Sequence, residues 1–349
     1  MEKKKHRLTK VICMIGAILL IAAIGLFVGG MTAAGWDFSK LSTVRYVQKN
    51  YYSRESISSL KIKYANAKIR VVYEDIEQSI HISYPVRVDQ NDEEIATVDF
   101  AYSEEDGSLT VTEKIEKHFD LFNWDLSAPV LTVTLPSGSI CAFDFTAQSG
   151  SIGFESAAPI QLNTLTLRSS NGDISATSEG GISVSGDVLL HADNGHIIAE
   201  NLTVGGSLHA ESDNGSISLS SVSANAVIAK TDNGDIRSAN VTAASKFSAE
   251  TDNGNIAFTK NLQANEIVCI TDNGNVTGET NCLLTAQSLS FTLDNGDLRI
   301  QGALAGKPED YTVLLNLKNG STNISSGGSG NKTLSATVQN GHIRVQFQN

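Results

Sequence analysis

The chain has 349 residues, of which 26 are Lys or Arg and 38 are Asp or Glu, giving a net charge of −12. The segment 1–34 holds five of these bases and one of the acids, so the remainder carries 21 bases and 37 acids, a net charge of −16. A surface of this sign repels nucleic acid and anionic lipid head groups, and nucleic-acid binding is therefore excluded.

The N-terminus has the pattern of a membrane anchor. A basic head at 1–10 precedes an uncharged apolar run at 11–34, which as a helix would be long enough to cross a bilayer core of about 30 Å. Because basic flanks stay in the cytoplasm, we expect a single-pass protein of the cell membrane with a cytoplasmic N-terminus and an extracytoplasmic C-terminal domain. A cleaved signal peptide is the alternative, since the small residues from Gly29 to Ala34 could accept a signal peptidase.

Two segments follow the apolar run. Residues 35–56 are polar and predict a juxtamembrane linker. Residues 57–136 alternate apolar and polar side chains, as at 60–71 and 130–135, without the repeat found further on. Because terminal repeats are atypical in repeat proteins, this stretch is interpreted as an N-terminal β capping region.

Asn-Gly pairs recur through residues 137–349 at a nearly constant interval. Counted from Gly150, successive glycines of the series lie about 20 residues apart, and a fixed period of this length predicts a solenoid, in which each repeat forms one coil of a stack. The asparagines are Asn171, Asn194, Asn214, Asn233, Asn253, Asn273, Asn295, Asn319 and Asn340.

Alignment of the repeats on their glycines indicates where the strands lie. The positions seven and five before glycine are apolar in every repeat, and the position four before is mostly polar, which is the alternation of a half-buried strand. The position two after glycine is apolar in every repeat except at Thr322, which indicates a second short strand. A less regular return segment closes each coil. The predicted fold is therefore all-β, a parallel β-solenoid of about ten coils of 19–24 residues over residues 137–349.

Turn chemistry accounts for the corner between the two strands. Glycine accepts positive φ without cost, and Asn is the next most tolerant residue. Stacked Asn side chains can hydrogen-bond from coil to coil as an amide ladder. An Asp precedes several of the pairs and is interpreted as an acceptor of backbone N–H groups in an Asx turn. These aspartates are Asp193, Asp213, Asp232, Asp252, Asp272 and Asp294.

The same aspartates are the candidates considered for a metal site. Like charges stacked one coil apart repel, and Ca²⁺, which binds carboxylate oxygens, would relieve that repulsion. A Ca²⁺-stiffened surface spacer is therefore one alternative. His191 and His209 lie in adjacent coils with the same outward parity and could approach a metal. Turn chemistry already explains the aspartates, however, and no cofactor or metal is assigned.

The basic head, the single apolar segment, the following Gly35-Trp36-Asp37-Phe38-Ser39 and the Asp-Asn-Gly-Asp/Asn-Ile repeats together resemble the bacterial putative-adhesin family. This is a domain of unknown function, also called toastrack-type for its stacked strands. The resemblance covers nearly the whole chain and implies a β-solenoid on the outer face of the cytoplasmic membrane. It also links the chain to relatives in envelope-stress systems, and the family has no catalytic residues to transfer.

These observations favour a non-enzymatic scaffold for adhesion or envelope-stress signalling. It would bind an envelope protein or a cell-wall carbohydrate through outward positions such as His191, Glu211, Lys230 and Glu250. A carbohydrate-active β-helix enzyme, a polysaccharide lyase or hydrolase, is the alternative, although such chemistry needs clustered carboxylates and the acids here are spread one per coil. The chain ends on a strand near Phe347, whose exposed edge offers a route to self-association.

Overall fold

The computed structural model describes residues 2–33, 35–36, 44–89, 91–115 and 129–348, and the chain divides into two compact units. The smaller unit comprises residues 1–47, 86–97 and 115–128 and contains the helix α1 (Glu2–Ala33). Within α1, the 20 residues Met14–Ala33 have a mean hydropathy of 2.4 and are long and apolar enough to cross a membrane. An ion pair between Arg45 and Asp92 also lies in this unit.

Strands make up most of the remaining chain. Residues 45–53, inside the expected linker, form a strand, while residues 37–43 of that linker lie outside the described residues. The strands before the Asn-Gly series are β1 (Arg45–Ser53), β2 (Ser59–Tyr64), β3 (Lys68–Glu74), β4 (Ile80–Val88), β5 (Ala96–Ser103), β6 (Ser108–Ile115) and β7 (Val130–Pro136). Those of the series are β8 (Ile140–Ser149), β9 (Ile152–Phe154), β10 (Ile160–Asn171), β11 (Ile174–Val184), β12 (Val188–Ala192), β13 (Ile197–Val204), β14 (Ser207–Ser212), β15 (Ile217–Thr231), β16 (Ile236–Thr251), β17 (Ile256–Phe258), β18 (Leu262–Asn273), β19 (Val276–Gly278), β20 (Leu283–Thr285), β21 (Ser288–Asn295), β22 (Leu298–Leu304), β23 (Tyr311–Asn319), β24 (Lys332–Asn340) and β25 (Ile343–Phe347), with a 3₁₀ turn at Pro308–Asp310.

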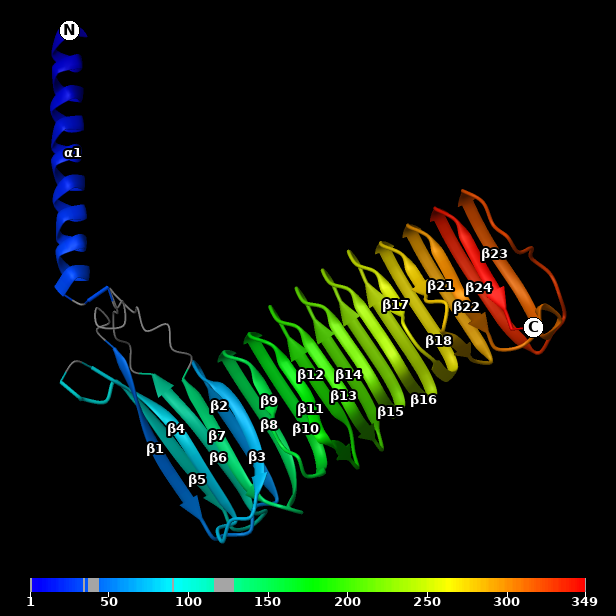
Figure 1. Cartoon of the computed structure of the whole chain (residues 1–349), viewed down its shortest axis with the longest axis horizontal. Coiled ribbons are helices and arrows are strands. Elements are labelled where there is room, and N and C mark those ends of the chain that lie inside the picture. The colour runs from blue at the N-terminus through cyan, green and yellow to red at the C-terminus, as the bar shows by residue number, and fades with distance from the viewer. Residues whose placement is uncertain (1, 34, 37–43, 90, 116–128, 349) are drawn as a thin grey trace. The chain divides into compact units, whose positions relative to one another are not determined.

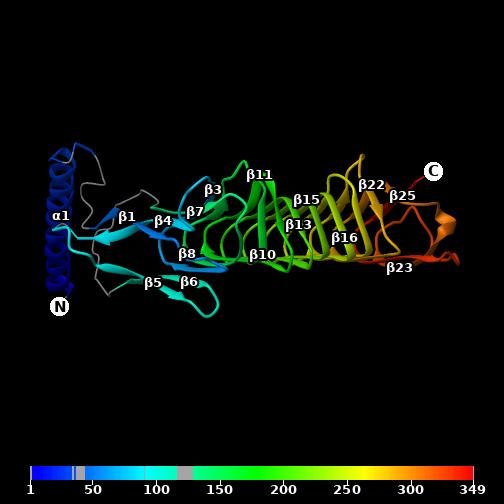
Figure 2. The same ribbon diagram turned by 90° about the horizontal axis from the view of Figure 1, so that it is seen from below.

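The larger unit is a parallel β-solenoid of about nine turns, which confirms the predicted fold class (Figure 1). Each coil crosses the Asn-Gly corner between two strands that pair in parallel with their counterparts in the next coil, as Val188 pairs with Leu208 and Ile197 with Ile217. The return segment is more regular than its sequence indicates. Leu202, Val222 and Val241 pair in register from coil to coil, so a third parallel ladder runs along the solenoid, and Figure 2 shows the coils side by side.

The interior of the solenoid is filled by the predicted apolar columns. The residues seven and five before glycine are buried in every coil from Phe143 to Phe291, and the isoleucine column after glycine is equally inaccessible. Burying one such side chain contributes roughly 1.5–3 kcal/mol, and neighbouring coils supply the covering surface that a single coil lacks. The stack is therefore held together mainly along its axis.

Near its N-terminal end, the stack does not follow chain order. β2 pairs with both β6 and β8, and β3 pairs with both β7 and β9. The coil formed by β2 and β3 therefore lies between two coils that come later in the chain: the one formed by β6 and β7, and the one formed by β8 and β9, which begins the Asn-Gly series. β4 then pairs with β7 in the antiparallel sense, which ends the parallel stack on that side.

The C-terminal end shows the same inversion. β24 pairs with β21 on one side and with β23 on the other, so the last coil in sequence lies inside the penultimate one. The last strand, β25, lies beside β22, and on its other side Ile343 bridges Thr322, so the edge expected at Phe347 is covered only where the strand begins. In the ladder that precedes the corner, the outermost strand is β23. Its edge is partly covered by the loop that follows it, since Val313 and Gly327 exchange both backbone hydrogen bonds.

Candidate functional site

The nine asparagines of the Asn-Gly corner form one continuous ladder. The Nδ2 group of each of them except Asn171, the first, donates to the Oδ1 atom of its neighbour at 2.8 to 3.3 Å. The ladder follows the stack and not the chain, because Asn340 donates to Asn295 at 3.0 Å and Asn319 then donates to Asn340 at 2.8 Å. Asn319 is therefore the last member.

Close approach between coils, more than turn geometry, explains the corner glycines. A left-handed φ occurs at Gly296, Gly320 and Gly341 but not at the other six glycines of the pairs, so the prediction that these serve positive φ is wrong for most of the series. A Cβ atom at Gly254 would instead lie 1.9 Å from the carbonyl oxygen of Gly234, and one at Gly274 would lie 1.8 Å from that of Gly254. Only glycine fits where the backbones of successive coils come this near.

A second ladder runs through the residues that follow the glycines. Each backbone N–H donates to the side chain of the equivalent residue one coil earlier, as His196 N–H does to Asp173 at 2.8 Å and Ser216 N–H to His196 Nδ1 at 3.0 Å. The same pattern continues from Asp235 to Asn255 and onward to His342. The sequence predicts that the aspartates before Asn accept backbone N–H groups. In the structure, the residues that follow the glycines accept them.

The six aspartates before Asn form a single file along the corner. Within the described residues, no backbone N–H donates to any of their carboxylates, so the predicted Asx turns are wrong for the aspartates before Asn. Asp193 pairs with His191 at 3.0 Å, and Asp294 accepts from Gln339 at 2.7 Å. The four between them are exposed, and we call these the acidic corner: Asp213, Asp232, Asp252 and Asp272. In the part of the chain that the structure describes, no group of three His, Cys, Asp or Glu side chains converges to hold a metal ion.

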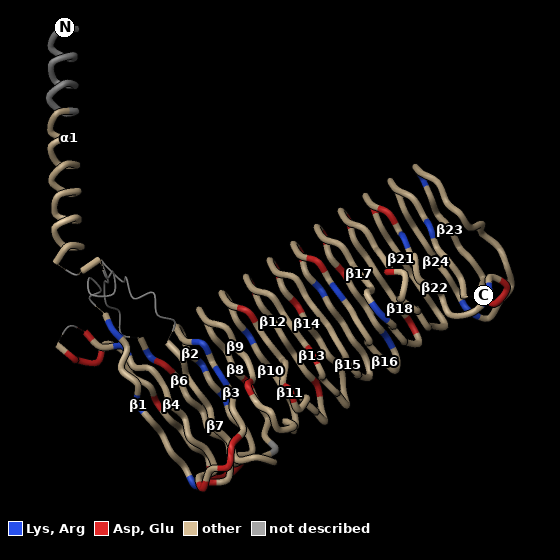
Figure 3. The backbone as a smooth tube through the Cα atoms, in the orientation of Figure 1, with Lys and Arg blue, Asp and Glu red and all other residues tan. Residues whose placement is uncertain are grey.

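His191, Glu211, Lys230 and Glu250 stand opposite one another on four adjacent coils, and we call them the charged column. They lie close to one another in pairs: the His191 ring lies 3.5 Å from Glu211, and Lys230 forms an ion pair with Glu250 at 2.9 Å. The hydrogen bond to Glu250, with the attraction of that carboxylate, raises the pKa of Lys230. Further ion pairs cross between coils on the same face, and Figure 3 shows acidic and basic positions recurring along the solenoid.

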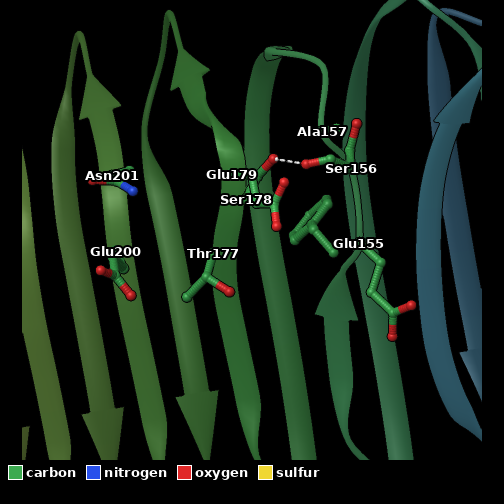
Figure 4. Close-up of a pocket in the computed structure, with 9 residues that line it drawn as sticks. Glu155, Ser156, Ala157, Thr177, Ser178, Glu179, Glu200 and Asn201 are labelled. Carbon is green, nitrogen blue, oxygen red and sulfur yellow. Dashed lines mark hydrogen bonds between the residues drawn. The ribbon is translucent and has the colours of Figure 1, made fainter.

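A hollow of about 550 Å³ lies at the other end of the strands that follow the Asn-Gly corner. Three glutamates from successive coils line it, together with hydroxyl groups (Figure 4). Glu155 pairs with Arg70 at 3.1 Å, and the Ser178 hydroxyl donates to the Ser156 carbonyl at 2.8 Å. The other members are Phe154, Ala157, Thr177, Glu179, Glu200 and Asn201.

Sequence reasoning missed this hollow. The signal was that Gly150, Gly172 and Gly195 are spaced more widely than the next glycines as far as Gly274, because the extra residues widen these coils beside the strands. The kink at this corner is made by left-handed residues, which are Gly181 at φ 79° in one coil and Asn201, Ser221 and Asn240 at φ 52° to 54° in the next three. Asn tolerates this conformation better than most residues, and a single Ser there carries some strain.

The fold and the corner define a class of protein: an acidic parallel β-solenoid built on an Asn ladder and preceded by an apolar helix. The Toastrack DUF4097 family matches residues 57–251 and 241–349, and the chain belongs to that family. The resemblance inferred from the repeats is thereby confirmed.

Solved structures with similarity to the chain include a putative adhesin from Bacteroides fragilis, at 15% identity over 67% of this chain and 97% of that one, with a TM-score of 0.40. A putative adhesin from Parabacteroides distasonis has 14% identity over 86% and 97% of the two chains, with a TM-score of 0.38. One from Parabacteroides merdae has 16% identity over 74% and 95%, with a TM-score of 0.36. No match was found among curated proteins.

Proposed function

We propose that the protein is a non-enzymatic, membrane-anchored scaffold of the cell envelope, whose acidic corner binds a cationic envelope component. The observation that carries this proposal is the contrast between two neighbouring surfaces. In the charged column Lys230 forms an ion pair with Glu250, whereas Asp213, Asp232, Asp252 and Asp272 are exposed carboxylates at one-coil spacing that form no ion pair with a described residue. A line of exposed like charge attracts an extended partner of opposite sign.

The anchor in this proposal is α1. Its basic head at 1–10 stays in the cytoplasm, and residues 11–34 cross the membrane, which leaves the solenoid outside the cell. The apolar side chains of α1 support this, since Ile21 is 70% and Leu26 is 79% exposed. Alkaline extraction of isolated membranes tests it: an anchored chain stays in the pellet at full length, whereas a shortened chain in the soluble fraction would mean that the segment is a cleaved signal peptide.

The binding proposal is tested by comparing two variants of the full chain that lose the same charge. One replaces the four aspartates of the acidic corner with asparagine. The control replaces four exposed acids elsewhere with glutamine, namely Glu104, Glu105, Glu279 and Glu309. Exposed charge pairs contribute up to about 1 kcal/mol each, so the corner variant should bind isolated cell envelopes up to roughly a thousandfold more weakly at low salt.

Three outcomes separate the hypotheses. Retention that falls with added salt and with the corner variant alone supports a cationic partner. Equal loss in both variants would reduce the effect to net charge and overturn the role of the corner. Because Glu179 and Glu200 share the hollow with Glu155, the enzyme alternative is tested in parallel by incubation with cell-wall and plant polysaccharides, where new reducing ends or unsaturated products would overturn the scaffold proposal.

A further inference from the structure

The end of the Asn ladder has a chemical consequence. In an Asn-Gly pair, the backbone nitrogen of glycine can attack the side-chain carbonyl carbon of asparagine, because glycine places no side chain in the way. All nine Asn-Gly pairs share this sequence and all nine asparagines are exposed, so neither feature separates them. What separates them is the side-chain oxygen: among the described residues, the Oδ1 atom of every asparagine in the ladder except Asn319 accepts a hydrogen bond from its neighbour.

Asn340 and Gly341 are a pair in which both reacting groups are hydrogen-bonded, and they serve as the comparison for Asn319 and Gly320. The Oδ1 atom of Asn340 accepts from Asn319 at 2.8 Å, and its Nδ2 group donates to Asn295 at 3.0 Å. The Gly341 N–H donates to the Asn319 carbonyl at 2.9 Å. The nucleophile and the carbon it would attack are therefore both held by the neighbouring coils.

Asn319 and Gly320 lie in the outermost coil, outside Asn340, and two of the three hydrogen bonds described for Asn340 and Gly341 have no counterpart there. Asn319 still donates to Asn340, but among the described residues nothing donates to its Oδ1 atom and the Gly320 N–H has no acceptor. Gly320 is also the exposed glycine of the series, whereas the glycines of the other eight pairs are buried or half-buried. Water and base reach this nitrogen most easily.

We propose that Asn319 is a site of spontaneous deamidation at the outer end of the solenoid. The Gly320 nitrogen loses its proton and bonds to Cγ of Asn319, the Cγ–Nδ2 bond breaks, and ammonia leaves. The resulting five-membered succinimide is opened by water at either carbonyl, which yields aspartate or isoaspartate. No oxidant, reductant or enzyme is needed, and water is the one co-reactant.

The products weaken the end of the solenoid. A carboxylate at position 319 cannot donate to Asn340 Oδ1, so the bond of 2.8 Å is replaced by repulsion between two acceptors. Asn340 then has the free carbonyl that Asn319 had before. Deamidation should therefore advance inward along the stack, with Asn319 first and Asn340 second, in the order of space and against the order of sequence.

The test uses the full chain in detergent micelles, aged at mildly alkaline pH. A Glu-specific protease cuts after Glu309 and leaves residues 310–349 as one fragment, because no glutamate follows. Asn319 and Asn340 are thus a matched pair inside one peptide, and fragmentation by mass spectrometry locates each amide-to-acid conversion. A hydrogen bond is worth roughly a factor of five, so two missing bonds predict conversion at Asn319 about twenty-five times faster than at Asn340.

Two comparisons make the result decisive. In denaturant the two sites should convert at similar rates, since both are followed by glycine. In the folded Asn319→Asp variant, whose fold is checked by its melting curve, conversion at Asn340 should rise roughly fivefold through the loss of one donor. Equal native rates at the two sites, or no conversion at Asn319 while the denatured chain converts, would overturn the proposal.

Discussion

The packing of coils at the Asn-Gly corner can be tested with a single methyl group. In Gly254→Ala, the new Cβ would lie 1.9 Å from the Gly234 oxygen, whereas ordinary contact begins at 3.4 Å, so the two coils must move apart locally by most of that difference. Such a shift breaks the hydrogen bonds that join them there: Asn253 to Asn233 at 3.1 Å, Thr251 to Gly234 at 3.0 Å and Asn255 to Asp235 at 3.0 Å.

Three hydrogen bonds at about 1 kcal/mol each give a loss of about 3 kcal/mol. The alanine also restricts the unfolded chain, which returns roughly 0.4–1 kcal/mol, so the free energy of unfolding should fall by about 2 kcal/mol. Gly153→Ala is the matched control, because its Cβ would lie 3.6 Å from Ser175 Cβ, an ordinary contact. That variant should equal the parent or gain up to about 1 kcal/mol. Urea unfolding followed by circular dichroism measures both, and equal stability of the two variants would refute close approach as the reason for the glycines.

Two further predictions concern thiol reactivity and charge. The thiols of the larger unit, Cys141, Cys269 and Cys282, are buried, and maleimide should label none of them at neutral pH before the protein unfolds. Burial raises the pKa of all three thiols, to about 11 at Cys141 and about 12 at Cys282. Rapid labelling of the native protein would contradict this prediction. The variant Asp272→Asn removes the repulsion between Asp272 and the carboxylates about 4.8 Å away on the neighbouring coils. It should stabilise the fold by about 1 kcal/mol at low salt and by less at high salt. A lower melting midpoint of the variant at low salt would contradict this, because it would show that an opposite charge already compensates the carboxylate.

The columns of the repeat were sufficient to predict the strands and the core, since stacked identical coils leave no other way to bury two apolar positions on each side of a corner. The reason for each glycine was not accessible in the same way. Turn residues and close-approach residues look alike in sequence, and only the position of the carbonyl one coil away distinguishes them, as at Gly254 and Gly234. The aspartates before Asn illustrate the same limit. The sequence predicts that they accept backbone N–H groups, but the side chains that do so follow the glycine, as Asp173 and His196 do.

The repeat pattern could not predict the spatial order of the coils, for a related reason. Because the coils share their apolar columns, Leu289 could pair with Val313 of the next coil in sequence as readily as with Leu334, its actual partner. The penultimate coil has Thr322 where the others have an apolar residue after glycine, so it offers the poorest template for a further coil. Placing that coil outermost leaves the full hydrophobic columns of β24 and β25 inside the stack.

The inversions at both ends also explain why a stack of nearly interchangeable coils stays finite. A parallel edge with a complete apolar column would accept another coil, including one from a second molecule. At one end β4 meets β7 in the antiparallel direction, and at the other Val313 is already paired with Gly327 of its own loop. Each end thus offers little of the template on which a further parallel coil would form, and the regular surface left for partners is the side of the solenoid, along the acidic corner and the charged column.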